Sequence, residues 1–329
     1  MRSYPVLAFF AFASPTFHVN GHPLIDDIDP YAVDKLKYLD KLPEWKSDVM
    51  ERLNVGFVDA WELAKFAILE LEDRDPDHDP KHPKPPSLIF KKYFLPNDHD
   101  AVLAVFKSIV TPNYRGNDRL KEVYFSNIDP AGECDIPSPD GEVKAGSVGM
   151  YTTPNTLHEE ERPSFIHVCP DIWTLGYPKS IHDIKCEDTC EDLKHNKCWP
   201  SARMATVAEV ILHELVHRTS YTKERPQGLL FPIIDQVMKD PKGGKDEHGN
   251  PKQVQVYGTY YTQQLLHIEK NKARYNADSY AMFARDAYWS YLCHSKKINY
   301  GSPPHWETNI PNKLKPKPPA MQVQLAGDL

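Results

Sequence analysis

The chain has 329 residues, of which 40% are hydrophobic and 26% charged, which is enough to enclose a core in one large domain or two small ones. Its net charge is −7, and its Lys and Arg residues are spread along the sequence rather than gathered in a stripe. This distribution argues against nucleic acid or an anionic membrane as a partner. We expect a monomer.

The first 21 residues are typical of a secretory signal peptide. Arg2 supplies the positive charge, residues 6–12 form a short apolar run, and small residues follow. A buried N-terminal helix is the alternative, but prolines bracket the segment. The run is too short to span a bilayer, and no later stretch reaches spanning length. We therefore predict a secreted, extracellular protein in which residues 22–44 form an N-terminal extension.

The first half of the folded domain is predicted to contain two helices and a small sheet. Apolar residues recur at helical spacing over residues 47–71 and again over residues 98–110. Short apolar pieces separated by Gly, Pro, Asn and Asp then predict strands at residues 123–125, 148–151 and 165–168. A sheet beside helices implies an α+β fold that is mostly helical.

Helical periodicity returns from residue 205. A polar, glycine-containing insert at residues 239–252 is predicted to be an exposed loop. Two more helices are expected, at residues 261–273 and 277–292. These elements place one domain at residues 45–300, and the proline-rich tail at residues 301–329 has little to bury and is expected to be disordered.

Six cysteines are distributed over residues 134–293 of the chain: Cys134, Cys169, Cys186, Cys190, Cys198 and Cys293. In an exported chain an even number of cysteines indicates disulfide bonds. The alternative is a metal knuckle formed by the three cysteines between residues 186 and 198. That alternative lacks the second Cys-x-x-Cys pair that such sites require.

The strongest functional signal is the sequence His213-Glu214-Leu215-Val216-His217. On a helix, residues four apart lie on one face, so both imidazoles can bind a single zinc ion. Glu214 lies beside that face, where it can act as the catalytic base that takes a proton from a zinc-bound water. The alternative is a partly buried helix whose histidines bond to backbone or carboxylate groups.

Zinc proteases with this motif differ in the third protein ligand. One pattern requires Gly and His after the second histidine, but Ser220 and Lys223 occupy those positions. A second pattern takes a glutamate from a downstream helix, for which Glu269 is the candidate. A third uses an aspartate.

Two segments carry a resemblance to a known family. The stretch at residues 210–217, Val-Ile-Leu-His-Glu-Leu-Val-His, together with Asn276-Ala-Asp-Ser-Tyr280, resembles the aspzincins, the fungal deuterolysin and lysine-specific metalloendopeptidase family. The resemblance covers roughly residues 45–295 and implies a zincin-like metalloprotease domain. It also implies that Asp278 is the third ligand to one Zn²⁺ ion, beside the two motif histidines.

The sequence departs from the family in one motif, Gly-Thr-x-x-Asp-x-x-Tyr-Gly. When Tyr257 is matched to the tyrosine of that motif, Val254 occupies the aspartate position. The insert can bring another acid to that place, and Asp235 and Asp246 are the candidates. A family tyrosine that steadies the oxyanion has no clear counterpart, with Tyr177 as one candidate.

The sequence therefore predicts a secreted zinc metalloendopeptidase that hydrolyses peptide bonds in protein or peptide substrates. The valine at position 254 motivates a second hypothesis, a secreted zinc-binding or antigen-like protein of the same fold without peptidase activity. A third hypothesis is a structural, disulfide-rich interaction protein that binds no metal.

Overall fold

The computed structural model describes residues 36–38, 47–72, 87–110, 123–127, 129, 131–134, 149–152, 165–169, 172, 177–186, 190–192, 197–198, 204–220 and 226–295. The predicted signal peptide and the proline-rich tail lie outside these ranges. Within them, no helix is both long enough and apolar enough to cross a bilayer.

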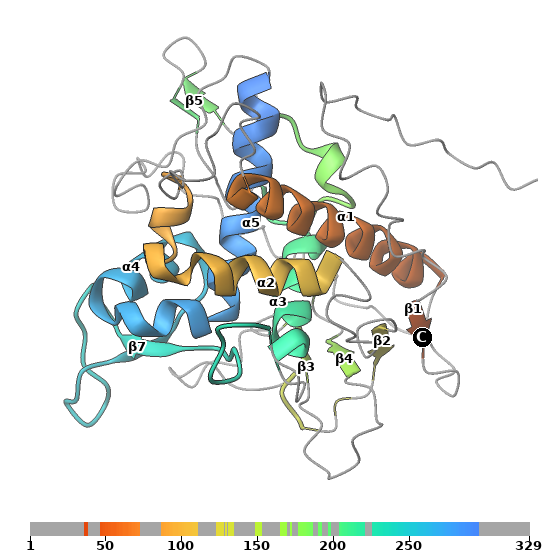
Figure 1. Ribbon diagram of the computed structural model, residues 1–329. Coiled ribbons are helices and arrows are strands. Elements are labelled where there is room, and N and C mark those ends of the chain that lie inside the picture. Colours follow the sequence, from red (N-terminus) through yellow and green to blue (C-terminus); the bar gives the residue numbers. More distant parts are fainter. Residues whose placement is uncertain are drawn as a thin grey trace, which may run out of the picture.

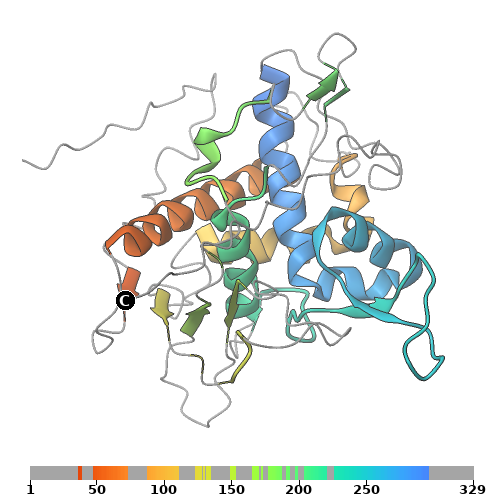
Figure 2. The same ribbon diagram turned by 180° about the vertical axis from the view of Figure 1, so that it is seen from behind.

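Five α-helices are the largest elements of the described structure, and a four-stranded sheet lies beside them (Figures 1 and 2). The helices are α1 (Ser47–Glu72), α2 (His99–Val110), α3 (Val207–Ser220), α4 (Gly258–Ile268) and α5 (Ala277–Ser295). The strands of the sheet are β1 (Leu36–Tyr38), β2 (Val123–Ser126), β3 (Met150–Thr152) and β4 (Phe165–Val168). The predicted α+β class, mostly helical with a small sheet, is confirmed.

The sheet has the strand order β1-β2-β4-β3, in which β3 is antiparallel to β4 and the other pairs are parallel. Three of its strands were expected from the sequence, and β3 lies about two residues further along than predicted. Strand β1 falls within residues 22–44, which the sequence separates from the domain, and it pairs with β2. The sheet therefore begins upstream of residue 45.

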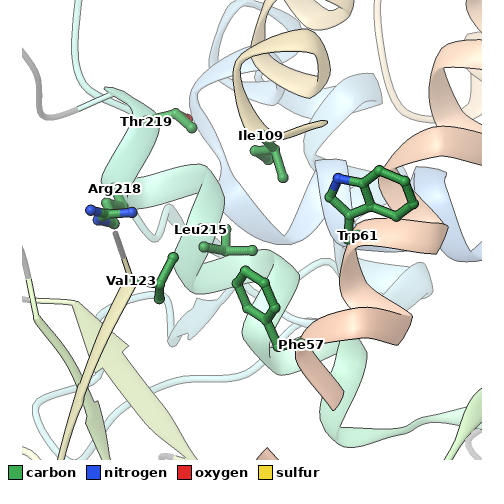
Figure 3. A pocket seen from close by; sticks show the side chains of 7 residues that line it. All are labelled: Phe57, Trp61, Ile109, Val123, Leu215, Arg218 and Thr219. Atoms are coloured by element: carbon green, nitrogen blue, oxygen red, sulfur yellow. The ribbon is translucent and has the colours of Figure 1, made fainter. Parts of the chain in front are cut away.

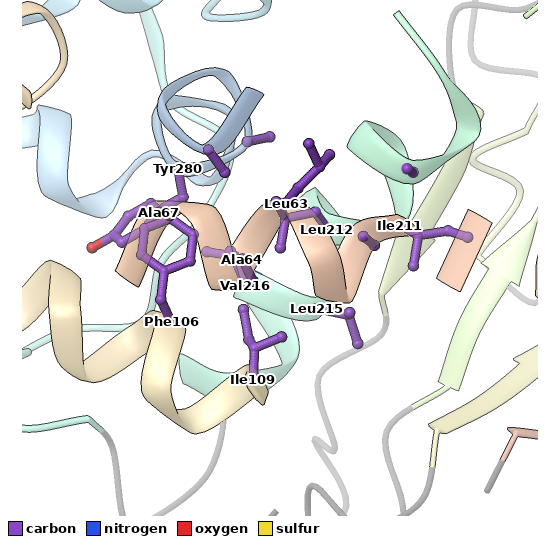
Figure 4. Close-up of a cluster of buried hydrophobic side chains, with 14 of the residues drawn as sticks. Leu63, Ala64, Ala67, Phe106, Ile109, Ile211, Leu212, Leu215, Val216 and Tyr280 are labelled. Atoms are coloured by element: carbon purple, nitrogen blue, oxygen red, sulfur yellow. The ribbon is translucent and has the colours of Figure 1, made fainter. Parts of the chain in front are cut away.

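Helix α3 lies at the centre of the molecule, with α1 and α2 running across it and α5 beside it (Figures 1 and 2). Nearly all of its residues are buried, which explains why apolar residues occur on more than one of its faces. The core between α1, α2, α3 and α5 is drawn in Figure 4. A Cβ on Gly56 of α1 would lie only 3.0 Å from Ile211 of α3, so glycine permits this close approach of the two helices.

A small pocket opens between α1, α2, α3 and β2 (Figure 3). From α3 it is lined by Leu215, Arg218 and Thr219, which lie on the side of the helix opposite His213 and His217. Most of its other lining is apolar. This pocket therefore belongs to the core between the helices and not to the histidine motif.

The polar insert is the connection of a β-hairpin, formed by β7 (Val237–Lys239) and β8 (Gln253–Gln255). Residues 240–252 between the strands are mostly exposed, as expected for a loop. One side of the hairpin packs on α4 through Met238 and Val256, which contact Leu265. The helix expected at residues 261–273 is shorter than predicted and continues as the 3-10 helix η11 (Lys270–Tyr275).

Two disulfides join distant segments, Cys134 to Cys169 and Cys186 to Cys293. The disulfide at Cys186 excludes the metal knuckle, because its thiol is not available to a metal. The last two cysteines face each other in the ladder between β5 (Cys190–Asp192) and β6 (Lys197–Cys198). Two disulfides fit an oxidising compartment.

Candidate active site

Helix α3 carries His213, Glu214 and His217 on the side that faces β3 and the segment before the hairpin. All three side chains are nearly buried, with 7%, 3% and 5% of their surfaces exposed. The two Nε2 atoms lie 3.0 Å apart, as the spacing of four residues on a helix predicts.

Asp235, which lies just before the hairpin, completes a triangle of donor atoms. Its Oδ1 atom is 2.9 Å from His213 Nε2 and 3.3 Å from His217 Nε2. Ligand atoms around a tetrahedral zinc ion, at bond lengths of about 2.0–2.1 Å, are separated by about 3.3 Å. The three atoms therefore have the spacing that a zinc ion requires of three protein ligands.

The hydrogen bonds of the two Nδ1 atoms determine that the Nε2 atom of each imidazole points into this triangle. His217 Nδ1 lies 2.8 Å from the Ile233 carbonyl oxygen, and His213 Nδ1 lies 3.3 Å from Asp278 Oδ1. A carbonyl oxygen and a carboxylate can only accept, so each Nδ1 carries the proton. In the neutral rings both Nε2 atoms then present lone pairs, which is the tautomer that binds metal.

This donor set fits a cation and fits little else. Two Nε2 lone pairs 3.0 Å apart repel each other, and Asp235 Oδ1 adds a third acceptor beside them. That oxygen is buried and has no hydrogen-bond partner of acceptable geometry among the described residues. A divalent ion would satisfy all three atoms at once.

The pKa values of the site residues also indicate that a positive charge belongs between the histidines and Asp235. Burial opposes protonation of His213, but the negative charge of Asp235, 2.9 Å away, and the hydrogen bond to Asp278 outweigh it and hold the His213 pKa well above its usual value. Burial would raise the pKa of Asp235, yet His213 and His217 outweigh it and keep that pKa far below its usual value. Without a metal, a proton takes the place of the cation, so metal binding must release it.

Glu214 is held beside the donor triangle by the edge strand of the sheet. Thr152 of β3 donates from its hydroxyl to Glu214 Oε2 at 2.8 Å, while Glu214 Oε1 lies 4.0 Å from His213 Nε2. Burial raises the pKa of Glu214, and this outweighs the opposing effect of the two histidines. A buried carboxylate with a raised pKa is suited to accept and return a proton near neutral pH.

Asp278, the third ligand implied by the family resemblance, lies on the opposite side of His213. Its Oδ1 contacts His213 Nδ1, and its Oδ2 accepts a hydrogen bond from the backbone N–H of Gly258. Gly258 has a φ of 74°, in the left-handed region that favours glycine. In this arrangement Asp278 orients the imidazole of His213, and its carboxylate is not part of the group of donor atoms formed by the two Nε2 atoms and Asp235.

The structure joins Asp235 to Tyr257 across the hairpin, although 22 positions separate them in the sequence. The Tyr257 hydroxyl donates to Asp235 Oδ2 at 2.9 Å, and its ring lies 5.9 Å from the ring of His213. Val254, matched to the family aspartate from the sequence, instead packs with the small apolar cluster under the hairpin. The acid beside the histidines is therefore Asp235.

The other candidates lie elsewhere. Glu269 ends α4 and forms an ion pair with Lys272. Asp246 sits at the exposed end of the hairpin, where its carboxylate accepts from the amides of its own turn. Tyr177 packs against the core, where burial and the charges of nearby carboxylates raise its pKa to about 12.

Asn276 has a role that sequence reasoning missed. It directly precedes α5, where its Oδ1 accepts from the Gln236 amide at 3.1 Å and its Nδ2 donates to the Val256 carbonyl at 3.4 Å. These partners are the immediate neighbours of Asp235 and Tyr257. Asn276 thus ties both segments of the site to the start of α5.

No protein-family model matches the chain, and no curated protein matches it. Among solved structures, it is similar to the zinc peptidase from Grifola frondosa, with 14% sequence identity and a TM-score of 0.38. The matched region covers 74% of this chain and 97% of that one. A similarity this distant leaves the geometry of the site as the basis for assigning a function.

Proposed function

We propose that the chain is a secreted zinc-dependent endopeptidase in which His213, His217 and Asp235 hold one Zn²⁺ ion. The observation that carries this proposal is the donor triangle, with two Nε2 atoms and one buried carboxylate oxygen about 3 Å from one another. Such a set with a glutamate next to it is typical of catalytic zinc sites, which keep a position open for water or substrate. The two disulfides support export.

A zinc ion held there would polarise the scissile carbonyl and lower the pKa of the attacking water. The chain's own residues supply the proton transfers. Glu214 takes the proton from the attacking water and returns it to the leaving amine, and the hydrogen bond from Thr152 fixes its orientation. Asp278 and the Ile233 carbonyl hold the two imidazoles in the required tautomer.

We further propose that Tyr257 stabilises the negative charge that develops on the carbonyl oxygen. Its hydroxyl lies beside Asp235, and its pKa is raised by burial and by the nearby carboxylates, so it stays protonated and can donate. We expect Tyr257→Phe to lower kcat by about 10²-fold or more with little change in zinc content. Steady-state kinetics on a peptide, with metal analysis of the same sample, measures both.

Tyr261→Phe is the matched control for this variant. Tyr261 lies four residues away on α4, where its ring contacts Tyr260 and the Lys242 ammonium group. It should keep full activity. A Tyr257→Phe enzyme with wild-type kcat would exclude the hydroxyl from the reaction.

Removing the metal tests the proposed function directly. A chelator should abolish hydrolysis of an unfolded protein substrate, and adding Zn²⁺ to the dialysed protein should restore it, because Glu214 alone cannot activate water sufficiently. Circular dichroism before and after chelation shows whether the fold survives. Activity that persists in the metal-free protein would reject the proposal.

The inactive alternative, a zinc-binding protein of the same fold, was motivated by the valine at position 254. With Asp235 beside the histidines, that motive is weaker, because the acid missing at position 254 has a substitute. Zinc binding without cleavage of any protein substrate would favour this alternative.

A further inference from the structure

A second group of side chains of the types that bind metals lies where α1 meets the turn at residues 180–183, and it shares no residue with the histidine motif. Asp59 and Glu62 are one helical turn apart on α1, and His182 reaches them from the 3-10 helix η7 (Ile181–Asp183). One ligand atom from each of the three residues lies within 4.8 Å of the other two. We propose that these residues form a second binding site for a zinc-like divalent transition metal.

The three side chains differ in exposure, from the buried Asp59 to the exposed His182. His182 Nε2 is 3.2 Å from Glu62 Oε2 and 4.0 Å from Asp59 Oδ1. The Asp59 side chain is 4% exposed, that of Glu62 28% and that of His182 57%. A metal can therefore enter past His182, and the short shifts needed to bring the atoms to coordinating distance fall on the two more exposed side chains.

Asp59 is fixed in the orientation that a ligand needs. Its Oδ2 accepts from the backbone N–H of Ile181 at 2.9 Å, which leaves Oδ1 on the side of His182. The turn itself is held by Ser180, whose hydroxyl accepts from the His182 amide, while Asp183 accepts from the Ser180 amide. The imidazole and the buried carboxylate are thus positioned by separate backbone contacts.

The charges around Asp59 leave room for a cation. Burial raises the pKa of Asp59, and the hydrogen bonds from Ile181 and Ser180 together with the His182 charge only partly offset this effect. In turn, the hydrogen bond to Glu62 and the charges of Glu62, Asp59 and Asp183 raise the pKa of His182 despite its burial. A divalent ion would neutralise both carboxylates more fully than a single imidazolium ion does.

The donor types select the metal. One imidazole with two carboxylates is a set that zinc and neighbouring transition metals accept, whereas calcium and magnesium prefer oxygen ligands alone. The site would link α1 to the segment that leads to the Cys186–Cys293 disulfide and so to α5. Its expected role is structural, since no described group beside it resembles the base that Glu214 provides.

Counting bound zinc in the full-length protein tests this inference. The metal-free protein is dialysed against low micromolar Zn²⁺, and its metal content is measured. We expect two equivalents in the wild type and one in His182→Gln, because the exposed imidazole can be replaced without disturbing the core. Glu62→Gln, also partly exposed, should likewise bind one equivalent.

His248→Gln is the matched control, because His248 is exposed and lies 3.3 Å from Glu247, but no third ligand joins them among the residues that the structure describes. It should keep two equivalents. His217→Ala should lose the other equivalent and keep this one, and zinc should still raise the melting temperature of His217→Ala by a few degrees but not that of the His217→Ala, His182→Gln double variant.

The outcomes separate the two sites. A wild type that binds one equivalent, lost in His217→Ala, would overturn the second site and leave the proposed function intact. Two equivalents that survive His182→Gln and Glu62→Gln would overturn it as well. A single equivalent that survives His217→Ala and disappears in His182→Gln would support the second site and contradict the zinc centre of the proposed peptidase.

Discussion

Replacing Glu214 with glutamine is expected to reduce peptide hydrolysis by about 10³-fold or more, because it removes the group that accepts a proton from the attacking water. The amide has nearly the same shape, and its oxygen can still accept the hydrogen bond from Thr152. The fold and the zinc content should therefore be unchanged. Initial rates on a peptide substrate, with metal analysis and circular dichroism, measure the three quantities separately.

Glu51→Gln provides the control for this change of charge. Glu51 lies on α1, where its exposed carboxylate pairs with Lys179 on the surface. Such a pair contributes little to stability, so this variant should behave as the wild type. If Glu214→Gln kept more than about a tenth of the wild-type rate, general-base catalysis by Glu214 would be excluded.

The sequence was sufficient for the parts of the fold that depend on local periodicity. Helices α1 and α2 lie close to their predicted ranges, and α3 begins two residues after the expected start, because apolar residues recur at helical spacing throughout each of them. The proximity of His213 and His217 also follows from one helix, with no knowledge of the tertiary structure.

Contacts between distant segments were beyond such reasoning. Strand β1 has three residues, and it is a strand only because β2 lies beside it. Asp278 was expected near the histidines, and it does contact His213. The sequence could not indicate which of the two ring nitrogens of His213 the Asp278 carboxylate contacts. A carboxylate near Nε2 could be a metal ligand, whereas one that contacts Nδ1 orients the ring.

Asp235 was one of two candidates because the hairpin hides its relation to Tyr257. If residues 237–255 are removed, the sequence closes to Asp-Gln-Val-Tyr-Gly, which has the Asp-x-x-Tyr-Gly spacing of the family motif. The ends of a hairpin are adjacent in space, so the insert leaves the geometry of the motif unchanged. The polar, glycine-containing composition of the insert was the signal that could have identified this arrangement.

Comparing Asp235→Ala with Asp278→Asn distinguishes the two candidates for the third ligand. We expect Asp235→Ala to weaken zinc binding by more than about 100-fold and to abolish activity, because it removes an atom of the donor triangle. Asp278→Asn should weaken binding by only about 10–100-fold, since it alters the hydrogen bond that orients His213. Competition with a chromogenic chelator measures both affinities.

The two variants also differ in what excess zinc can restore. Asp278→Asn should recover most of its activity at saturating Zn²⁺, because its amide oxygen can still accept from His213 Nδ1 and all three proposed ligands remain. Asp235→Ala should remain inactive even when metal is forced into the site, because the ion would lack one of its three protein ligands and Tyr257 would lose its partner. The opposite pattern, with Asp278→Asn the variant that zinc cannot rescue, would make Asp278 the ligand and Asp235 the partner of Tyr257.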